Sequence, residues 1–91
     1  MNANEALKSA NRKVSEALKI RRDSPNIAFR MLIDAADSYE YLSLYNLSQN
    51  ALEYALEVQC DFLEPDQSKF AELIREARIR NFARYINGGD A

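Results

Sequence analysis

The chain has 91 residues, of which 47% are hydrophobic and 29% are charged, and its formal net charge is −2. This length allows one domain, here expected to cover residues 1–91, and the composition is that of a globular protein rather than a disordered one. The slight negative charge gives no bulk attraction to nucleic acid or anionic lipid, and two glycines and two prolines are too few turn residues for a sheet protein.

The first predicted helix covers about residues 3–22 and has a narrow, mostly alanine stripe. Ala10, Val14 and Ala17 recur at spacings of four and three, which is heptad spacing. Because alanine removes little apolar area from water, we predict that this helix is the most weakly held. Ser24 and Pro25 mark the start of the next helix, since serine is a common N-cap and proline suits the first helical position.

The second predicted helix, about residues 25–45, is apolar around more than half of its circumference. A helix of this kind is covered on two sides, so we expect it to be the central element of the fold. Its inner face is predicted to carry apolar residues at helical spacing: Ile27, Ala28, Met31, Leu32, Ala35, Tyr39 and Leu42.

The third predicted helix covers about residues 47–63, and no glycine or proline separates it from the second. We nevertheless place a break near Asn46, because one straight helix would put the polar strips of the two segments on nearly opposite sides. Asparagine tolerates the left-handed backbone of a helix end, and Asn46 or Ser48 can cap the next helix. The inner face of this third helix is predicted to hold Ala51, Tyr54, Ala55, Val58 and Phe62.

The fourth predicted helix, about residues 67–87, carries two apolar stripes. The first stripe consists of Phe70, Leu73, Ile74 and Ala77. The second, rotated from it by about 150° at about 100° per residue, consists of Ile79, Phe82, Ala83 and Ile86. A straight helix cannot direct both stripes at one core. Either the helix bends near Arg78 or wraps against the first helix, or the second stripe contacts another protein.

These elements predict an all-α fold, a small antiparallel four-helix bundle built from helical hairpins. The run Ala-Leu-Glu-Tyr-Ala-Leu at residues 51–56, followed by Pro65, resembles the second helix of a tetratricopeptide hairpin. The likeness covers one repeat, with Asn46 in place of the turn glycine, the aromatic residue one position early and no second copy along the chain. It implies a helix-hairpin style, and we do not assign the family.

The sequence contains few candidates for catalytic or metal-ligating residues. There is no histidine, which removes the usual nucleophile pairs and zinc-ligand sets. Asp34, Asp37 and Glu40 are spaced to hold a hard cation, but a solvated face is preferred because metal sites in bundles normally add a Glu-x-x-His motif. Cys60 is expected to be a small buried residue rather than a reactive thiol. We therefore expect no enzymatic activity, no cofactor and no metal.

The displaced stripe of the fourth helix suggests a protein-interaction module. Its expected contact residues are Ile79, Phe82 and Ile86, together with Tyr85, Arg78 and Tyr41. The expected partner is a second copy, in a homodimer, or a larger protein that the chain regulates. The alternative is a nucleic-acid-binding regulator that uses Arg75, Arg78, Arg80 and Arg84, although these arginines face different directions and pairing with the acidic third helix is preferred.

The expected location is the cytoplasm, without membrane association. No run approaches the roughly eighteen apolar residues of a membrane span, and the polar N-terminus lacks the apolar core of a signal peptide. A single cysteine excludes an intrachain disulfide, which fits a reducing compartment.

Overall fold

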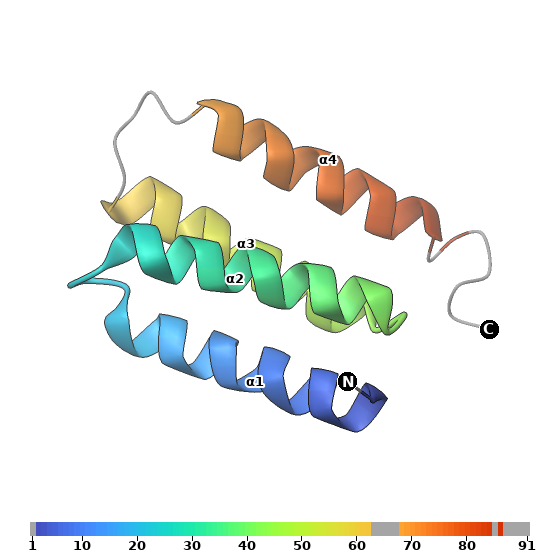
Figure 1. The fold of residues 1–91 in the computed structure, drawn as a ribbon. Helices are drawn as coiled ribbons and strands as arrows, with labels where there is room; N and C mark the ends of the chain where they lie inside the picture. Colours follow the sequence, from blue (N-terminus) through green and yellow to red (C-terminus); the bar gives the residue numbers. More distant parts are fainter. Residues whose placement is uncertain (1, 63–67, 85, 87–91) are drawn as a thin grey trace.

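The computed structural model describes residues 2–62, 68–84 and 86 (Figure 1). Within these residues the chain forms four α-helices: α1 (Ala3–Ile20), α2 (Pro25–Tyr41), α3 (Tyr45–Phe62) and α4 (Ser68–Arg84). Consecutive helices run antiparallel and each packs chiefly on the next one along the chain, so that α1 and α4 lie on opposite sides of the α2–α3 pair (Figure 1). The prediction of an all-α helical bundle is confirmed.

Helix α1 packs on α2 through small side chains. Ala10 and Ala17 are fully buried, while Leu7 and Val14 are partly buried against the same core. These are positions of the predicted heptad stripe, so that face is confirmed. Beside the stripe, the hydroxyl of Tyr39 on α2 donates a hydrogen bond to Asn11 on α1. Without this bond, the buried Tyr39 hydroxyl would lack a partner, which would cost folding free energy.

Among the side chains that the structure describes, α2 supplies more buried residues than any other helix, as expected of a central element. Pro25 occupies the first turn and Ser24 is the N-cap residue, but the Ser24 side chain makes no capping hydrogen bond. Its carbonyl instead accepts the bond from the Ala28 amide, at 2.9 Å. One predicted core residue is misplaced: Ile27 is 57% exposed, because it lies in the first turn of the helix, at the edge of the packed layer.

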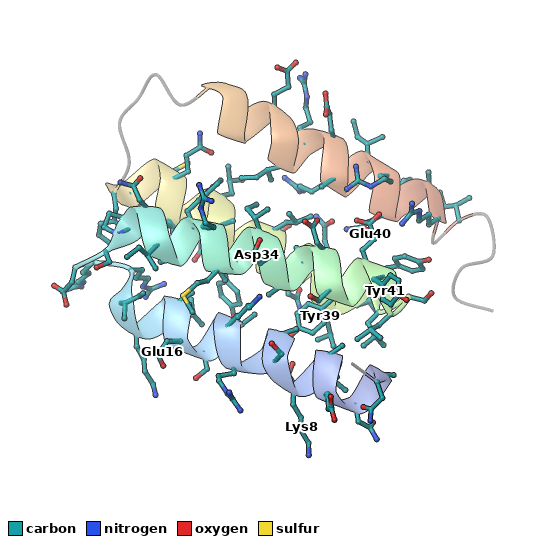
Figure 2. The ribbon with its side chains drawn as sticks, viewed as in Figure 1. Lys8, Glu16, Asp34, Tyr39, Glu40 and Tyr41 are labelled. Atoms are coloured by element: carbon teal, nitrogen blue, oxygen red, sulfur yellow. The ribbon has the colours of Figure 1, made fainter. Side chains whose placement is uncertain are left out.

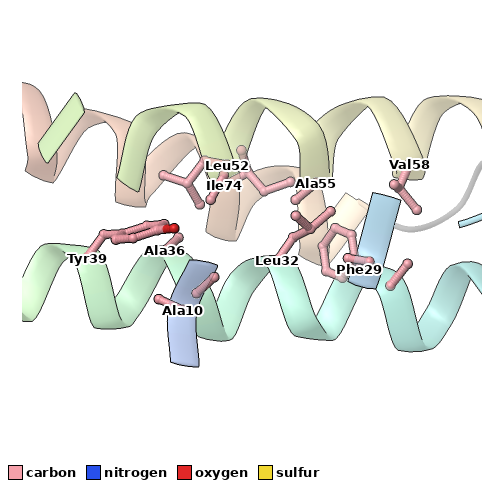
Figure 3. Packing of buried hydrophobic residues seen from close by; sticks show 13 residues of the cluster. Ala10, Phe29, Leu32, Ala36, Tyr39, Leu52, Ala55, Val58 and Ile74 are labelled. Carbon is pink, nitrogen blue, oxygen red and sulfur yellow. The ribbon is translucent and has the colours of Figure 1, made fainter. Parts of the chain in front are cut away.

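The core lies between α2 and α3 and extends toward α4 (Figure 3). Leu32 and Leu52 are fully buried there, and Ile74 closes the core from α4. On α3, Tyr54 and Phe62 are exposed, contrary to the prediction. Tyr54 lies at the border of the inner face and Phe62 is the last residue of the helix, so neither is covered by α2.

Cys60 was predicted to be buried, and this prediction is wrong. It is a free, exposed cysteine on α3, because its position on the helix is rotated by about 140° from the centre of the buried face. Among the helices of the described residues, none combines the length and apolar character needed to cross a lipid bilayer.

The break between α2 and α3 exists, but it lies at residues 42–44 and not near Asn46. Ser43 adopts a left-handed backbone with φ of 61°. Its amide donates to the carbonyl of Glu40 at 3.0 Å, and the amide of Leu44 donates to the carbonyl of Tyr39 at 2.8 Å. This pair of bonds is the Schellman ending of a helix, which usually places glycine at the left-handed position. Asn46 lies in the first turn of α3 and is exposed, and Ser48 is buried rather than capping.

Ser43→Gly is expected to stabilise the protein by about 1 kcal/mol, because glycine carries no Cβ to oppose a positive φ. Part of the gain is offset by the larger entropy of glycine in the unfolded chain. The measurement is the urea midpoint, followed by far-ultraviolet circular dichroism. Ser43→Ala serves as the control, since alanine keeps the Cβ and should give no gain. Equal midpoints for Ser43→Gly and the unaltered protein would contradict the left-handed assignment.

Candidate protein-interaction surface

An open groove runs between the amino-terminal half of α3 and the carboxy-terminal half of α4. Its volume is about 670 Å³. It is lined by Tyr45, Asn46 and Gln49 from α3 and by Arg75, Arg78, Ile79, Asn81 and Phe82 from α4. The groove therefore joins apolar side chains to amide and guanidinium groups, the mixture found at protein interfaces.

The second apolar stripe of α4 points to solvent beside this groove. Helix α4 runs without interruption from Ser68 to Arg84 and docks on α3, so it turns one face inward only. Ile74 of the first stripe is buried, whereas Ile79, Phe82 and Ile86 are 62%, 65% and 62% exposed. The predicted conflict between the two stripes is thus resolved by exposure of the second stripe, and not by packing against α1. The side chains of Phe70 and Leu73, also assigned to the first stripe, lie outside the described residues.

The other predicted contact residues divide into three cases. Arg78 lines the groove. Tyr41 is 87% exposed, as expected, but it lies at the end of α2 and does not line the groove (Figure 2). Tyr85 lies outside the described residues. The structure therefore brings Arg78, Ile79 and Phe82 together and leaves Tyr41 apart.

Arginines hold α4 against the rest of the bundle. The Arg80 guanidinium donates from Nε and Nη2 to the two carboxylate oxygens of Glu40 on α2, at 2.7 and 3.1 Å. Arg84 also donates to Glu40. On the groove side, Arg78 Nη2 lies 3.3 Å from Glu53 Oε1 of α3. The hydrogen bond from Arg80 lowers the pKa of Glu40 below its ordinary value, although burial acts in the opposite direction.

Glu40→Gln is expected to reduce stability by about 1 kcal/mol near neutral pH. The figure is modest because both arginines remain about half exposed, so solvent screens the pair. A lowered folded-state pKa means that the carboxylate contributes stability above its ordinary value of 4.5 and loses that contribution as the pH falls through the folded pKa. The variant should therefore lose less stability than the unaltered protein between about pH 5 and about pH 3.

The pH comparison is made by urea denaturation of both proteins. Salt supplies an independent check, since about 1 M sodium chloride should shrink the difference between them. A difference that is unchanged by pH and by salt would show that Glu40 acts through packing and not through its charge.

A buried polar relay beside the groove was not anticipated from the sequence. Asn81 is 3% exposed. Its Nδ2 donates to Ser48 Oγ at 2.9 Å, and Ser48 Oγ donates to the carbonyl of Ala36 at 2.9 Å. The relay links α4 to α3 and α2, but Asn81 Oδ1 has no hydrogen-bond partner among the described residues. Asn81 is seven residues after Ile74, and this heptad interval was the available signal that the two share a face.

Among the three carboxylates considered as a cation site, Glu40 makes ion pairs with α4. Glu40 is bound by two arginines, and burial raises the pKa of Asp37, with the negative charge of Glu40 adding to that rise. Within the described residues no group of three metal-ligating side chains converges. Asp34 is exposed on the same helix. What the arrangement can do chemically is therefore ion pairing that positions α4.

The arginines considered as a nucleic-acid surface all have carboxylate partners in the chain. Besides the contacts of Arg78, Arg80 and Arg84, Arg75 Nη2 lies 3.9 Å from Glu72 Oε1 on its own helix. The predicted pairing with α3 holds for Arg78 only, because Arg80 and Arg84 reach back to α2. Arg78, Arg80 and Arg84 already pair with carboxylates of other helices and therefore gain less from phosphate, which argues against this alternative.

No family model, curated protein or solved structure matches this chain. The likeness of residues 51–56 to a tetratricopeptide helix therefore stays a likeness of hairpin style.

Proposed function

We propose that the protein is a non-enzymatic interaction module of the cytoplasm, which binds a second copy of itself or regulates a larger protein through α4 and the adjoining groove. One observation carries the proposal: Ile79 and Phe82 on α4 line the groove, and these two residues and Ile86, two residues beyond the end of α4, are each more exposed than buried. Scattered exposed apolar residues are ordinary, but a row beside a groove is typical of a binding surface.

The energetics support a contact of useful strength. Complete burial of a large apolar side chain is worth about 1.5–3 kcal/mol, so covering three side chains that are roughly 60% exposed returns about 1–2 kcal/mol each. The same residues contribute little to the chain's own core. An exposed apolar row that adds nothing to folding, next to a groove with hydrogen-bonding walls, is best explained by a protein partner.

Site-specific photo-cross-linking tests this function. A photoreactive benzoylphenylalanine is placed at residue 82, and the matched control places it at residue 27, where Ile27 of α2 is 57% exposed. In cells that naturally make the chain, residue 82 should form protein cross-links that residue 27 does not form. A second substitution, Ile79→Ser, should reduce them. Equal cross-linking at both positions, or none at residue 82, would overturn the proposal.

A further inference from the structure

We propose that the occupant of the groove is a second copy of this chain, related by a two-fold axis that runs along the groove, so that α4 of each copy packs on α3 of the other. This inference rests on the proposed function, since it names the partner of the same surface.

The two helices that border the groove carry opposite charge. Arg75 and Arg78 of α4 line the groove, while Glu53 and Glu57 of α3 are exposed one and two turns beyond the lining residue Gln49. Arg78 and Glu53 already meet across the groove at 3.3 Å. Because α3 and α4 run antiparallel (Figure 1), the next turn of α3 lies level with the preceding turn of α4, which places Glu57 level with Arg75. Arg75 is largely exposed, and its contact with Glu72, at 3.9 Å, is longer than the contacts that Arg78 and Arg80 make with carboxylates.

Only one arrangement of two copies makes these charges complementary. A two-fold axis along the groove keeps every residue at its own level and sets α4 opposite α3 of the other copy. Arg75 then faces Glu57 of the second copy, and Arg78 faces its Glu53. A two-fold axis across the groove would instead set α4 against α4, and the arginine wall of one copy would meet that of the other. Like charges at such a contact oppose association, so the axis along the groove is favoured.

The same axis covers the exposed apolar row. On α4, Arg75, Ile79 and Phe82 follow each other at intervals of four and three residues, the spacing at which one helix inserts side chains between those of another. Ile86 lies two residues beyond the end of the helix. Phe82 shares the groove with Tyr45 and Gln49. With each residue kept at its own level, Phe82 of one copy meets the second copy's Tyr45 and Gln49. The apolar row is thereby buried by groove walls that can also hydrogen-bond.

The size of the face suits a dimer. Helices of 17 and 18 residues rise about 25 Å, and two neighbouring helices present a width of about 20 Å. The flat projection is then about 500 Å², and its corrugated accessible surface approaches the roughly 800 Å² that each partner buries in a standard interface. A contact of this size supports a reversible dimer.

A charge-exchange experiment tests the arrangement. Sedimentation velocity is run on the full chain from about 1 µM to about 1 mM. Arg75→Glu alone and Glu57→Arg alone should each weaken self-association by about tenfold, because each creates two like-charge contacts in the dimer. An equimolar mixture of the two variants should restore affinity to within about threefold of the unaltered protein, since both cross-copy contacts are again attractive.

The controls separate local charge from net charge. Lys8→Glu and Glu16→Lys lie on α1, at the opposite side of the molecule (Figure 2), and should leave self-association unchanged. Circular dichroism confirms that each variant is folded. A mixture that associates no better than the single variants would overturn the proposed axis, because an ion pair within one copy is not repaired by mixing.

The outcomes also distinguish this inference from the proposed function. Unaltered protein that stays monomeric up to about 1 mM would overturn the second copy as occupant. If residue 82 then still cross-links to a different protein, and Ile79→Ser abolishes the product, the interaction module stands while the dimer fails. If residue 82 cross-links to nothing, both fail.

Discussion

Replacing Leu32 with alanine is expected to cost about 3 kcal/mol of folding stability. Leu32 is 0% exposed and lies in the core between α2 and α3 (Figure 3). The substitution removes buried methyl groups and leaves a cavity that two rigid helices cannot close, and both effects are destabilising. A chain of this length is stable by about 5–14 kcal/mol, so the variant should lose a large share of its stability. Urea denaturation measures the loss as a lowered midpoint at unchanged slope.

The matched control is Phe82→Ala. Phenylalanine is the larger side chain, yet at position 82 it is 65% exposed, so its removal should change the stability of the monomer by less than about 0.5 kcal/mol. Both variants are compared at a protein concentration at which the chain is monomeric. A cost at Phe82 as large as that at Leu32 would mean that the second stripe of α4 belongs to the core.

Local patterns in the sequence predict much of this fold. Pro25 fixes the start of α2, because a proline is tolerated in the first turn of a helix and little further in. Ala10 and Ala17 locate the contact of α1 through their seven-residue interval. The two stripes of α4 are visible as a phase shift, and the exposure of the second follows from the impossibility of burying both. Each of these inferences depends only on residues within one turn or two of each other.

The turn between α2 and α3 shows where local patterns fail. Asn46 has the better propensity for a left-handed helix end, yet Ser43 adopts it. The helix ends where the burial of Tyr39 and Leu44 requires it: the Leu44 amide closes on the Tyr39 carbonyl, and both side chains pack into the core. The packing of Tyr39 and Leu44 therefore outweighs the unfavourable left-handed backbone of Ser43. The sequence around Ser43 does not indicate this, because the packing depends on residues of other helices.

The contacts that position the candidate site could not be predicted either. Glu40 meets Arg80 and Arg84 across 40 and 44 residues of sequence, and Asn81 meets Ser48 across 33 residues. The spacing of the carboxylates on α2 suggested a bound cation. In the structure, the positive charge beside Glu40 comes from the guanidiniums of Arg80 and Arg84 on α4. Only the packing order of the helices, which places α4 over both α3 and the end of α2, brings these groups together.

Helix α4 is held in the bundle by polar groups as well as by apolar packing. Ile74 is buried, and the polar contacts are the relay through Asn81, the pair of Arg78 with Glu53 and the arginines on Glu40. Ile79 and Phe82 of the same helix are mostly exposed. Because burial of apolar surface is the main driving force of folding, these two side chains contribute little to it. They are the residues that the proposed partner would bury.

Changing Asn81 to aspartate is the most direct test of how α4 is held. The two side chains have nearly the same shape, but the substitution places a carboxylate in a site that is 3% exposed and where Asn81 Oδ1 has no hydrogen-bond partner among the described residues. At neutral pH we expect a loss of about 2–4 kcal/mol, because a buried charge is left unpaired and the donor to Ser48 Oγ is gone.

The pH dependence of the stability of Asn81→Asp separates the effect of a buried charge from the effect of altered packing. Burial raises the folded-state pKa of the introduced carboxyl above its unfolded value of about 3.9. The protonated form can again donate to Ser48 Oγ, so stability should increase as the pH falls from about 7.5 to about 5, whereas the Glu40 contribution stays constant over that range. The control Asn81→Leu carries no charge and should shift stability by less than about 1.5 kcal/mol, without this pH dependence. If Asn81→Asp is as stable as the unaltered protein at neutral pH, water reaches the relay, and α4 is held on α3 by the burial of Ile74 and by the pair of Arg78 with Glu53.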